Sequence, residues 1–363
     1  MSQLNSQAVE QALKETIDPN TGKDLVASGA VADIAVEGAT VRARLCLGYP
    51  ARSFVAELAG IVEDKVKALE GVERVEVDAS WEIQSHSVQK SLKPLANIRN
   101  VIAVASGKGG VGKSTTAVNL ALALAAEGAA VGLLDADIYG PSQPTMLGIR
   151  GQPDTKDGET LEPLDSFGVQ AMSIGFLIDE ETPMIWRGPM VTQALEQLLN
   201  NTNWRGLDYL VVDLPPGTGD VQLTLAQKIP VSGAVIVTTP QDIALLDARK
   251  GIKMFEKVDV PILGIIENMS THICSQCGHE EHIFGAGGGD RIARDYGVEV
   301  LGRLPLDKAI REQTDGGKPT VVAEPHGRLA GVYLETARKT AARLAVRAKD
   351  YSAKFPKIVI QND

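Results

Sequence analysis

The sequence predicts an α/β fold in which a mostly parallel sheet carries helices on both faces, preceded by a small α+β domain. From about Ile98 onward, short apolar runs alternate with longer amphipathic stretches. Continuous apolar runs are typical of strands that are buried on both faces, so we expect a parallel sheet covered by helices. The residues before this point show the alternation of half-buried strands around one helical stretch.

The predicted small domain spans residues 1–85. Residues 30–49 alternate in the strand manner around a Glu-Gly turn, which predicts two strands. Residues 53–69 have helical spacing, and residues 72–83 return to a strand pattern. Residues 86–97 are polar, lack clear periodicity and contain a proline, so we expect a linker there.

The second predicted domain spans residues 98–363 and contains the longer apolar runs. Helical stretches separate these runs, and no internal repeat or low-complexity tract is evident. This alternation is typical of a parallel sheet with covering helices. The strand candidates are residues 101–106, 130–137, 169–174, 207–215, 233–240, 261–269 and 298–306.

Composition restricts the class of protein. The chain has 363 residues, of which 44% are hydrophobic, and a net charge of -10, so we expect a globular protein without a nucleic-acid partner. The N-terminus has no apolar core of the signal-peptide kind, and no later apolar run reaches the length of a membrane span. We therefore expect a cytoplasmic protein without stable membrane association.

A phosphate-binding loop is predicted at residues 107–114, because GKGGVGKS matches G-x-x-x-x-G-K-[ST] between a strand and a helix. The glycines let backbone N–H groups turn toward the phosphates, Lys113 reaches the β and γ phosphates, and Ser114 coordinates magnesium. The residues expected to bind the nucleotide here are Gly107, Lys108, Gly109, Gly110, Val111, Gly112, Lys113, Ser114 and Thr115. The motif predicts an ATP site.

Three aspartates at strand ends are candidate partners of this loop. Asp213 lies near the end of the strand candidate 207–215 and is the expected carboxylate partner of magnesium. Asp135 and Asp137 follow another strand, and either can reach magnesium or its water shell. Asp137 is the candidate for orienting the attacking water, whereas capping of a turn is an equal alternative for Asp135.

Lys108 gives the loop the sequence K-G-G-V-G-K-S, which resembles the signature of the deviant Walker-A ATPases. The resemblance implies a homodimer in which Lys108 contacts the phosphates bound by the neighbouring subunit. A cation supplied in trans stabilises phosphate charge only when two chains enclose the nucleotide. The alternative is a solvated loop lysine, since a lone charged side chain usually remains in water.

The same resemblance implies further residues near the base. Asn268, at the end of the strand candidate 261–269, is the expected adenine contact, and Pro305 and Asp307 belong to a second loop near the base. In MIWRGPM, Arg187 has a catalytic, an interface or a structural role, and Trp186 is expected to pack.

Cys274 and Cys277 form a C-x-x-C. Two thiolates at this spacing can ligate a metal ion or an iron-sulfur cluster, but tetrahedral zinc and four-iron clusters normally take four protein ligands. His279 and His282 are an alternative second pair for zinc, although one residue alone separates Cys277 from His279. A homodimer would instead supply both cysteines twice, around its two-fold axis. Cys46 belongs to the other domain and is expected to be structural.

Taken together, the motifs resemble the Mrp/ApbC family of iron-sulfur cluster carrier ATPases across about residues 98–350. The motifs that carry the resemblance are the phosphate loop, DADIYGPS, VVDLPPGTGD, ENMS, CSQCG and FGAGGG. Residues 1–85 resemble the small SufT-type domain that often precedes this ATPase. However, LGYPARS has no cysteine after its proline, so a docking role is expected for this domain instead of a thiol-based one.

The resemblance implies a homodimer that hydrolyses ATP with Mg²⁺, carries a [4Fe-4S] cluster bridging two subunits and delivers it to apoproteins. Cluster assembly scaffolds are the other implied partners. Two alternatives remain open at this point. The first is a partition or positioning ATPase that uses the basic helical stretch near the C-terminus, and the second is a zinc-bridged nucleotide-binding scaffold.

Overall fold

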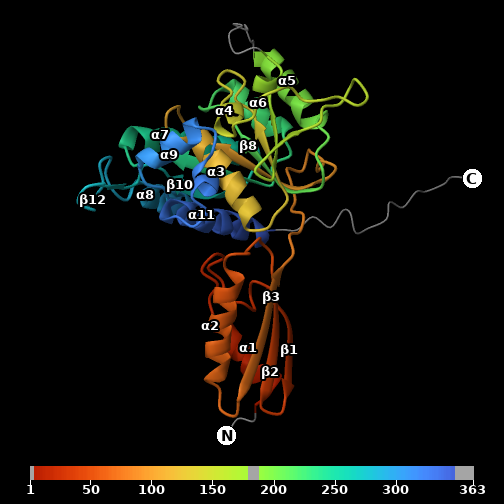
Figure 1. Cartoon of the computed structure of the whole chain (residues 1–363), viewed down its shortest axis with the longest axis vertical. Helices are drawn as coiled ribbons and strands as arrows, with labels where there is room; N and C mark the ends of the chain where they lie inside the picture. The colour runs from red at the N-terminus through yellow and green to blue at the C-terminus, as the bar shows by residue number, and fades with distance from the viewer. Residues whose placement is uncertain (1–3, 179–187, 348–363) are drawn as a thin grey trace, which may run out of the picture.

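The computed structural model describes residues 4–178 and 188–347. They form a three-stranded sheet near the N-terminus and an eight-stranded sheet in the rest of the chain (Figure 1). Helix α11 lies along the boundary between the two (Figure 1). No described helix is both long and apolar enough to pass through a bilayer.

The three-stranded sheet has the order β1-β2-β3, with β1 antiparallel and β3 parallel to β2. Helix α2 packs on this sheet through one apolar face that includes Leu58, Val62 and Val66, at i, i+4 and i+8. The strands and α2 lie where alternation and helical spacing predict them, whereas helix α1 is not predicted. The elements are α1 Ser6–Lys14, β1 Val31–Glu37, β2 Thr40–Leu47, α2 Val55–Lys67 and β3 Arg74–Trp81.

The eight-stranded sheet has the order β13-β10-β9-β4-β8-β5-β7-β6. All neighbouring strands are parallel except the short edge strand β6, which pairs antiparallel with β7 and is not predicted from the sequence. The strands are β4 Ile98–Ala105, β5 Val131–Asp135, β6 Leu164–Ser166, β7 Val169–Ser173, β8 Leu207–Asp213, β9 Gly233–Thr238, β10 Ile262–Glu267 and β13 Val300–Arg303.

Helices cover this sheet, which confirms the predicted fold class. Helices α3 and α11 pack against each other, while α5, α6, α7 and α8 contact one another in series. The helices are α3 Lys113–Ala126, α4 Gln143–Met146, α5 Gly188–Asn200, α6 Asp220–Lys228, α7 Asp242–Lys257, α8 Gly288–Tyr296, α9 Lys308–Asp315, α10 Thr320–Ala323 and α11 Arg328–Ala345. A separate hairpin joins β11 His272–Ile273 to β12 Glu280–Glu281.

A buried carboxylate joins the small sheet domain to the second domain. Glu127, at the C-terminal end of α3, is fully buried and pairs with Arg338 of α11 at 2.6 Å. The backbone N–H of Ser53, just before α2, donates to the same carboxylate at 2.9 Å. Helix α3 begins at the phosphate loop, so the small domain rests on the far end of the phosphate-loop helix.

The segment predicted as a linker, residues 86–97, is packed onto the second domain. The side-chain amide of Gln89 donates to the carbonyls of Ala226 and Ile229 at 2.9 and 3.1 Å. Its Oε1 accepts from the N–H of Val231 at 3.0 Å. Both the amide nitrogen and the carbonyl oxygen of this buried side chain are therefore hydrogen-bonded, which composition alone does not reveal. The domain limits 1–85 and 98–363 remain predictions.

Candidate nucleotide site and cysteine hairpin

The phosphate loop follows β4 and turns directly into α3. Gly110 and Gly112 have φ values of 80° and 78°, which L side chains rarely adopt. A Cβ added to Gly107 would lie 2.2 Å from the backbone of Asp247 in α7. The sequence therefore places glycine where the loop must turn left-handed and where α7 approaches it.

Lys113 is the charged centre of the site. Its Nζ forms an ion pair with Asp213, lies 3.1 Å from the hydroxyl of Ser114 and is 4.0 Å from the Asp137 carboxylate. Lys113 and Asp213 are both buried, so their interaction is little screened by water. Strands β4, β5 and β8 end side by side, and this brings the three groups together as the sequence predicts.

Asp135 and Asp137 differ in their surroundings. Asp135 is fully buried, and one of its oxygens accepts from the N–H groups of Ser142 and Gln143 at 3.0 and 3.1 Å. Burial, together with the neighbouring charge of Asp213, raises the pKa of Asp135 to about 7. The structure thus places Asp135 in the turn-capping role, whereas Asp137 faces Lys113.

Burial also raises the pKa of Asp137, against the opposing effect of the Lys113 charge. The side chain of Asp137 keeps 13% of its exposure, while Asp213 has none. Asp137 is therefore the carboxylate of the three with access to solvent. This is the position that a water-orienting group requires.

The chemistry of this donor set suits Mg²⁺, which prefers hydroxyl and carboxylate oxygens and keeps several waters. Ser114 and Asp213 both contact Lys113, so their oxygens lie in one cluster. Within residues 4–178 and 188–347, no group of three or more His, Cys, Asp or Glu side chains forms a ready-made metal site. The protein alone therefore supplies few ligands, and phosphate oxygens would have to supply others.

Gln143 is a site residue that sequence reasoning missed. Its side-chain amide donates to Asp213 Oδ2 at 2.8 Å and to the carbonyl of Ser114 at 3.1 Å. Its backbone N–H holds Asp135. The side chain is buried, and its Oε1 has no hydrogen-bond partner among the described residues. A polar residue three positions after IYG is the available signal, but nothing in the sequence shows its burial.

Lys108 differs from Lys113 in its contacts. It is half-buried, and its ammonium makes no ion pair or hydrogen bond with any residue in the described part of the chain. Its carbonyl oxygen accepts from the hydroxyl of Ser106 at 2.9 Å, which fixes the backbone at this point. The loop is thus ordered around Lys108, while the charge itself has no partner within the described residues of the same chain.

Asn268 connects the phosphate loop to β10. Its Nδ2 donates to the carbonyl of Val111 at 2.8 Å, and a Cβ on Gly112 would lie 2.2 Å from the same nitrogen. Its neighbour Glu267 is buried and accepts from the N–H of Gly289, at the start of α8. In the structure Asn268 therefore contacts the loop itself, and its adenine contact remains a prediction.

The second predicted base-side loop lies next to the cysteine hairpin. Asp307 accepts from the N–H of Ala309 at 2.9 Å and so caps the N-terminus of α9, and Pro305 is buried. The N–H of Leu306 donates to the carbonyl of Thr271 at 2.7 Å. Capping gives Asp307 a structural role, and base contact by Pro305 and Asp307 remains a prediction.

Cys274 and Cys277 lie in the turn between β11 and β12. The N–H of Cys274 donates to the carbonyl of His279 at 2.9 Å, and its carbonyl accepts from Gly278 at 2.9 Å. Hydrogen bonds from the backbone of Cys277 and Gln276 lower the pKa of the Cys274 thiol. Cys277 is exposed. Both thiols are free, and a lowered pKa favours the thiolate that iron and zinc require.

The histidines do not complete a metal site with this pair. The Nδ1 of His282 lies 2.9 Å from the carbonyl of Ser270, and no cluster of three or more metal-ligating side chains occurs in the described residues. The described part of one chain therefore presents two thiols and no further ligands.

Cys46 lies in β2 of the small domain. Trp186 and Arg187 fall outside the described residues.

A family model described as NUBPL iron-transfer P-loop NTPase matches residues 97–341, which is more than half of the chain. The chain belongs to this family. A second model, described as an iron-sulfur cluster assembly protein, matches residues 6–78 of this NUBPL-type NTPase. The predicted fold class, the predicted family and the prediction of a P-loop ATPase are thereby confirmed.

Relatives of this NUBPL-type NTPase span most of its length. It is 60% identical over 274 residues to the iron-sulfur cluster carrier protein of Pseudomonas fragi, covering 75% of this chain and 96% of the relative. It is 50% identical over 327 residues to the iron-sulfur cluster carrier protein of Escherichia coli K12, covering 90% and 89%.

Solved structures show the same architecture. The nucleotide-binding protein of Archaeoglobus fulgidus, solved in complex with ADP, is 38% identical, has a TM-score of 0.57 and covers 65% of this chain and 93% of its own. The cell division ATPase MinD of Pyrococcus furiosus shares the fold at 23% identity and a TM-score of 0.51, covering 66% of this chain and 97% of its own.

Proposed function

We propose that this NTPase hydrolyses ATP and uses the reaction to bind an iron-sulfur cluster and to pass it to apoproteins. One observation carries the proposal: Asn268, the residue directly after strand β10, holds the phosphate loop, and the chain then continues within six residues to Cys274. The residue that holds the phosphate loop and the thiol pair thus both follow the end of the same strand. The iron-sulfur cluster carrier proteins to which the chain is similar support the choice of cargo.

The hydrolysis step follows from the arrangement around Lys113. The backbone N–H groups of the loop and the start of α3 bind the phosphates, and Lys113 exchanges its ion pair with Asp213 for the phosphate charge. Asp137, the carboxylate with solvent access, orients the attacking water. When Mg²⁺ is bound by Ser114 and Asp213, it supplies positive charge to the phosphate oxygens.

We infer that the active form is a homodimer. The free ammonium of Lys108 is a cation available to the phosphates of a second subunit. The exposed side chains of Ile243 and Leu246 lie within one turn of Asp247 in α7, and the backbone of Asp247 lies against Gly107. Exposed apolar side chains beside a nucleotide loop suit a surface that another subunit covers.

The same dimer completes the cluster site. Each chain supplies Cys274 and Cys277, and two hairpins facing one another give four thiolates for a [4Fe-4S] cargo. Cys277 in the turn of the hairpin is exposed, and so is Ile283, two residues after β12, which offers an apolar side chain to a partner surface. Asn268 couples the nucleotide site to the hairpin, because a movement of the phosphate loop displaces Asn268 and the chain that leads from it to the hairpin.

Two alternatives account for less of the structure. A positioning ATPase that uses its basic C-terminal helix would need a free apolar face, but α11 buries Leu329, Tyr333 and Ala337 against the rest of the chain. A zinc-bridged scaffold uses the same four thiolates and differs in the metal.

The three free cysteines fit a reducing compartment, and we place the protein in the cytoplasm.

Cluster transfer tests the proposal. The protein is reconstituted anaerobically with iron and sulfide, then mixed with an apoprotein whose activity requires a four-iron cluster, with and without ATP. We expect the apoprotein to regain activity with wild-type protein and to remain inactive with the Cys274→Ala, Cys277→Ala double variant. Bound zinc without iron in anaerobically isolated protein, with no transfer, would support the scaffold instead.

A further inference from the structure

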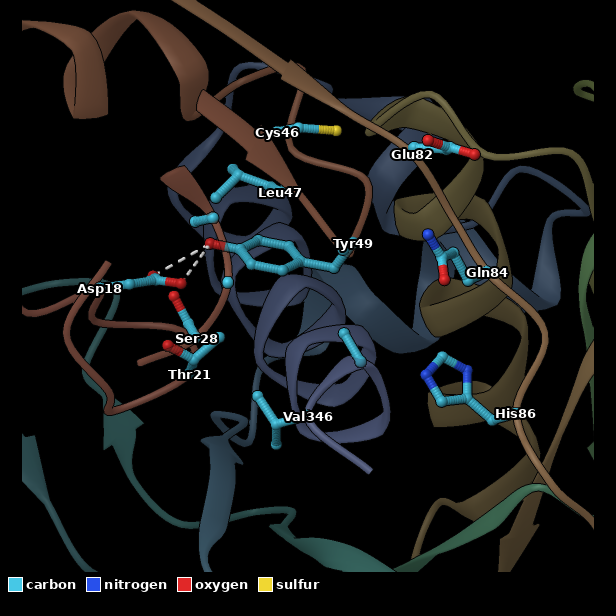
Figure 2. Close-up of a pocket in the computed structure, with 14 residues that line it drawn as sticks. Asp18, Thr21, Ser28, Cys46, Leu47, Tyr49, Glu82, Gln84, His86 and Val346 are labelled. Atoms are coloured by element: carbon cyan, nitrogen blue, oxygen red, sulfur yellow. Dashed lines mark hydrogen bonds between the residues drawn. The ribbon is translucent and has the colours of Figure 1, made fainter. Parts of the chain in front are cut away.

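A cavity of about 240 Å³ lies where the small domain meets the end of α11. Its walls come from three places: the small domain, the segment after β3, and the last turn of α11 (Figure 2). In Figure 2, Tyr49 lies in the middle of the lining, with Cys46 and Glu82 toward one end and His86 toward the other. None of the residues that line the cavity belongs to the phosphate loop or to the cysteine hairpin, so it is a separate site.

The charges of the lining have one sign. The described residues that line the cavity include the carboxylates of Asp18 and Glu82 and no lysine or arginine. Asp18 is fully buried and forms no ion pair within residues 4–178 and 188–347. A buried carboxylate without an ion-pair partner is costly in a region of low dielectric constant. The charge of Arg338 reaches Tyr49 from outside the lining, but its guanidinium is paired with Glu127.

The hydrogen-bond partners of Asp18 are neutral, so they do not compensate its negative charge. The hydroxyl of Tyr49 lies 2.9 and 3.0 Å from the two carboxylate oxygens, and the N–H of Asn20 donates to Oδ1 at 2.9 Å. Burial and the charge of Asp18 raise the pKa of Tyr49, so the phenol stays protonated and acts as the donor. A carboxylate can accept more hydrogen bonds than these two groups supply.

The other walls also offer acceptors. They include the side-chain carbonyl oxygen of Gln84 and the carboxylate of Glu82. Glu82 is exposed at the rim, and it forms no ion pair in the described part of the chain. The lining thus combines two carboxylates with neutral polar side chains.

We propose that this cavity binds an organic cation with several N–H donors, either a guanidinium or a primary ammonium group. Such a group supplies the positive charge that the lining lacks and N–H donors for its carboxylates. The volume suits a single side chain or a small amine and is below the usual range for drug-sized ligands. The two sources of this chemistry are a basic side chain of a partner protein and a free polyamine. The occupant would contact both domains and hold them together.

Cys46 provides a reporter inside the cavity, because its half-buried thiol is part of the lining. In full-length protein carrying Cys274→Ser and Cys277→Ser, Cys46 is the single remaining cysteine. Its alkylation by iodoacetamide is followed by mass spectrometry at constant ionic strength. The probes are the N-acetyl methylamides of arginine and lysine, spermidine, and the neutral N-acetyl-citrulline methylamide.

A cationic probe at about twice its Kd should slow Cys46 alkylation about threefold, because only the free fraction reacts. The citrulline probe should leave the rate unchanged. Protection at lower concentration by the arginine or lysine probe would assign the site to a partner's side chain, and protection at lower concentration by spermidine would assign it to a free amine. Equal protection by citrulline, or no protection by any cation, would overturn the proposal.

Two variants identify the groups responsible. Glu82→Gln changes an exposed rim residue and should fold normally, yet the protection should weaken; full protection in this variant contradicts a role for the rim charge. Asp18→Asn should abolish protection, with the melting temperature measured in parallel to separate binding from folding. Asp33→Asn is the matched control, because it removes one charge from an exposed site in β1 of the same domain and should keep full protection.

Discussion

Asn268 donates a hydrogen bond from Nδ2 to the carbonyl oxygen of Val111 at 2.8 Å, which ties the end of β10 to the phosphate loop. Six residues after Asn268, the chain reaches Cys274 in the cysteine hairpin. The carbonyl of Ser270, between them, accepts a hydrogen bond from His282 on the far side of the same hairpin. A short stretch of backbone thus connects the phosphate loop with the cysteines that we propose as ligands of the cargo.

Replacing Asn268 by Ala should weaken this connection. Loss of one buried hydrogen bond costs about 1 kcal/mol, so ATP affinity should fall roughly fivefold. The larger effect should be on coupling: cluster transfer should no longer respond to ATP, while iron content after reconstitution stays at the wild-type level. Transfer assays with and without ATP measure this. Asn203→Ala, at an exposed site, is the control, and an unchanged ATP response in Asn268→Ala would contradict the coupling role.

Replacing Gln143 by Met should disturb the orientation of Asp213. The variant keeps the size of the side chain but removes the donor to Oδ2, and hydrogen bonds to a charged group contribute about 1.5–3 kcal/mol. We expect kcat for ATP hydrolysis to fall at least about tenfold, with KM changed little. The tightening of ADP binding by Mg²⁺, measured by calorimetry, should shrink in parallel. Gln170→Met, on β7 beside the edge strand β6, should change neither quantity; normal kcat and Mg²⁺ response in Gln143→Met would refute this role.

Lys108 and Lys113 should complement each other across subunits. Lys108→Ala and Lys113→Ala homodimers should both be inactive, because each site lacks one cation. A mixed dimer has one site with both lysines, so an equal mixture should recover about one quarter of wild-type hydrolysis if subunits exchange freely. ATPase rates at several mixing ratios measure this. If activity stays at the level of the separate variants at every ratio, Lys108 does not act in trans.

Glu127→Ala should destabilise the junction between the domains. It leaves Arg338 partly buried without its ion pair and removes the acceptor for Ser53, a loss of about 3–5 kcal/mol in the free energy of unfolding. Urea unfolding followed by circular dichroism measures it. The exposed pair of Glu15 and Lys65 offers the control, since Glu15→Ala should have little effect. A loss below about 1 kcal/mol in Glu127→Ala would mean that the pair behaves like a surface ion pair.

Local patterns predict the parts of this protein that depend on backbone periodicity. The apolar runs give the strands of the parallel sheet, and GKGGVGKS gives the position of Lys113 between β4 and α3. Edge strand β6 has three residues, too few to show a pattern. Gln143 and Gln89 are polar residues whose roles come from burial by distant segments, and sequence alone does not show which glutamines are buried. Likewise, Asn268 contacts Val111 across 157 positions of the chain.

The most direct test of the central claim is the iron and sulfide content of the protein after anaerobic reconstitution, measured per dimer with ATP affinity alongside. Wild-type protein should hold about four irons and four sulfides per dimer. Cys274→Ala, Cys277→Ala and the double variant should all lose them while ATP affinity stays unchanged, because each change leaves at most two of four thiolates and none touches the phosphate loop. Iron and sulfide near wild-type levels in the double variant would contradict a cluster held by these two cysteines from each subunit.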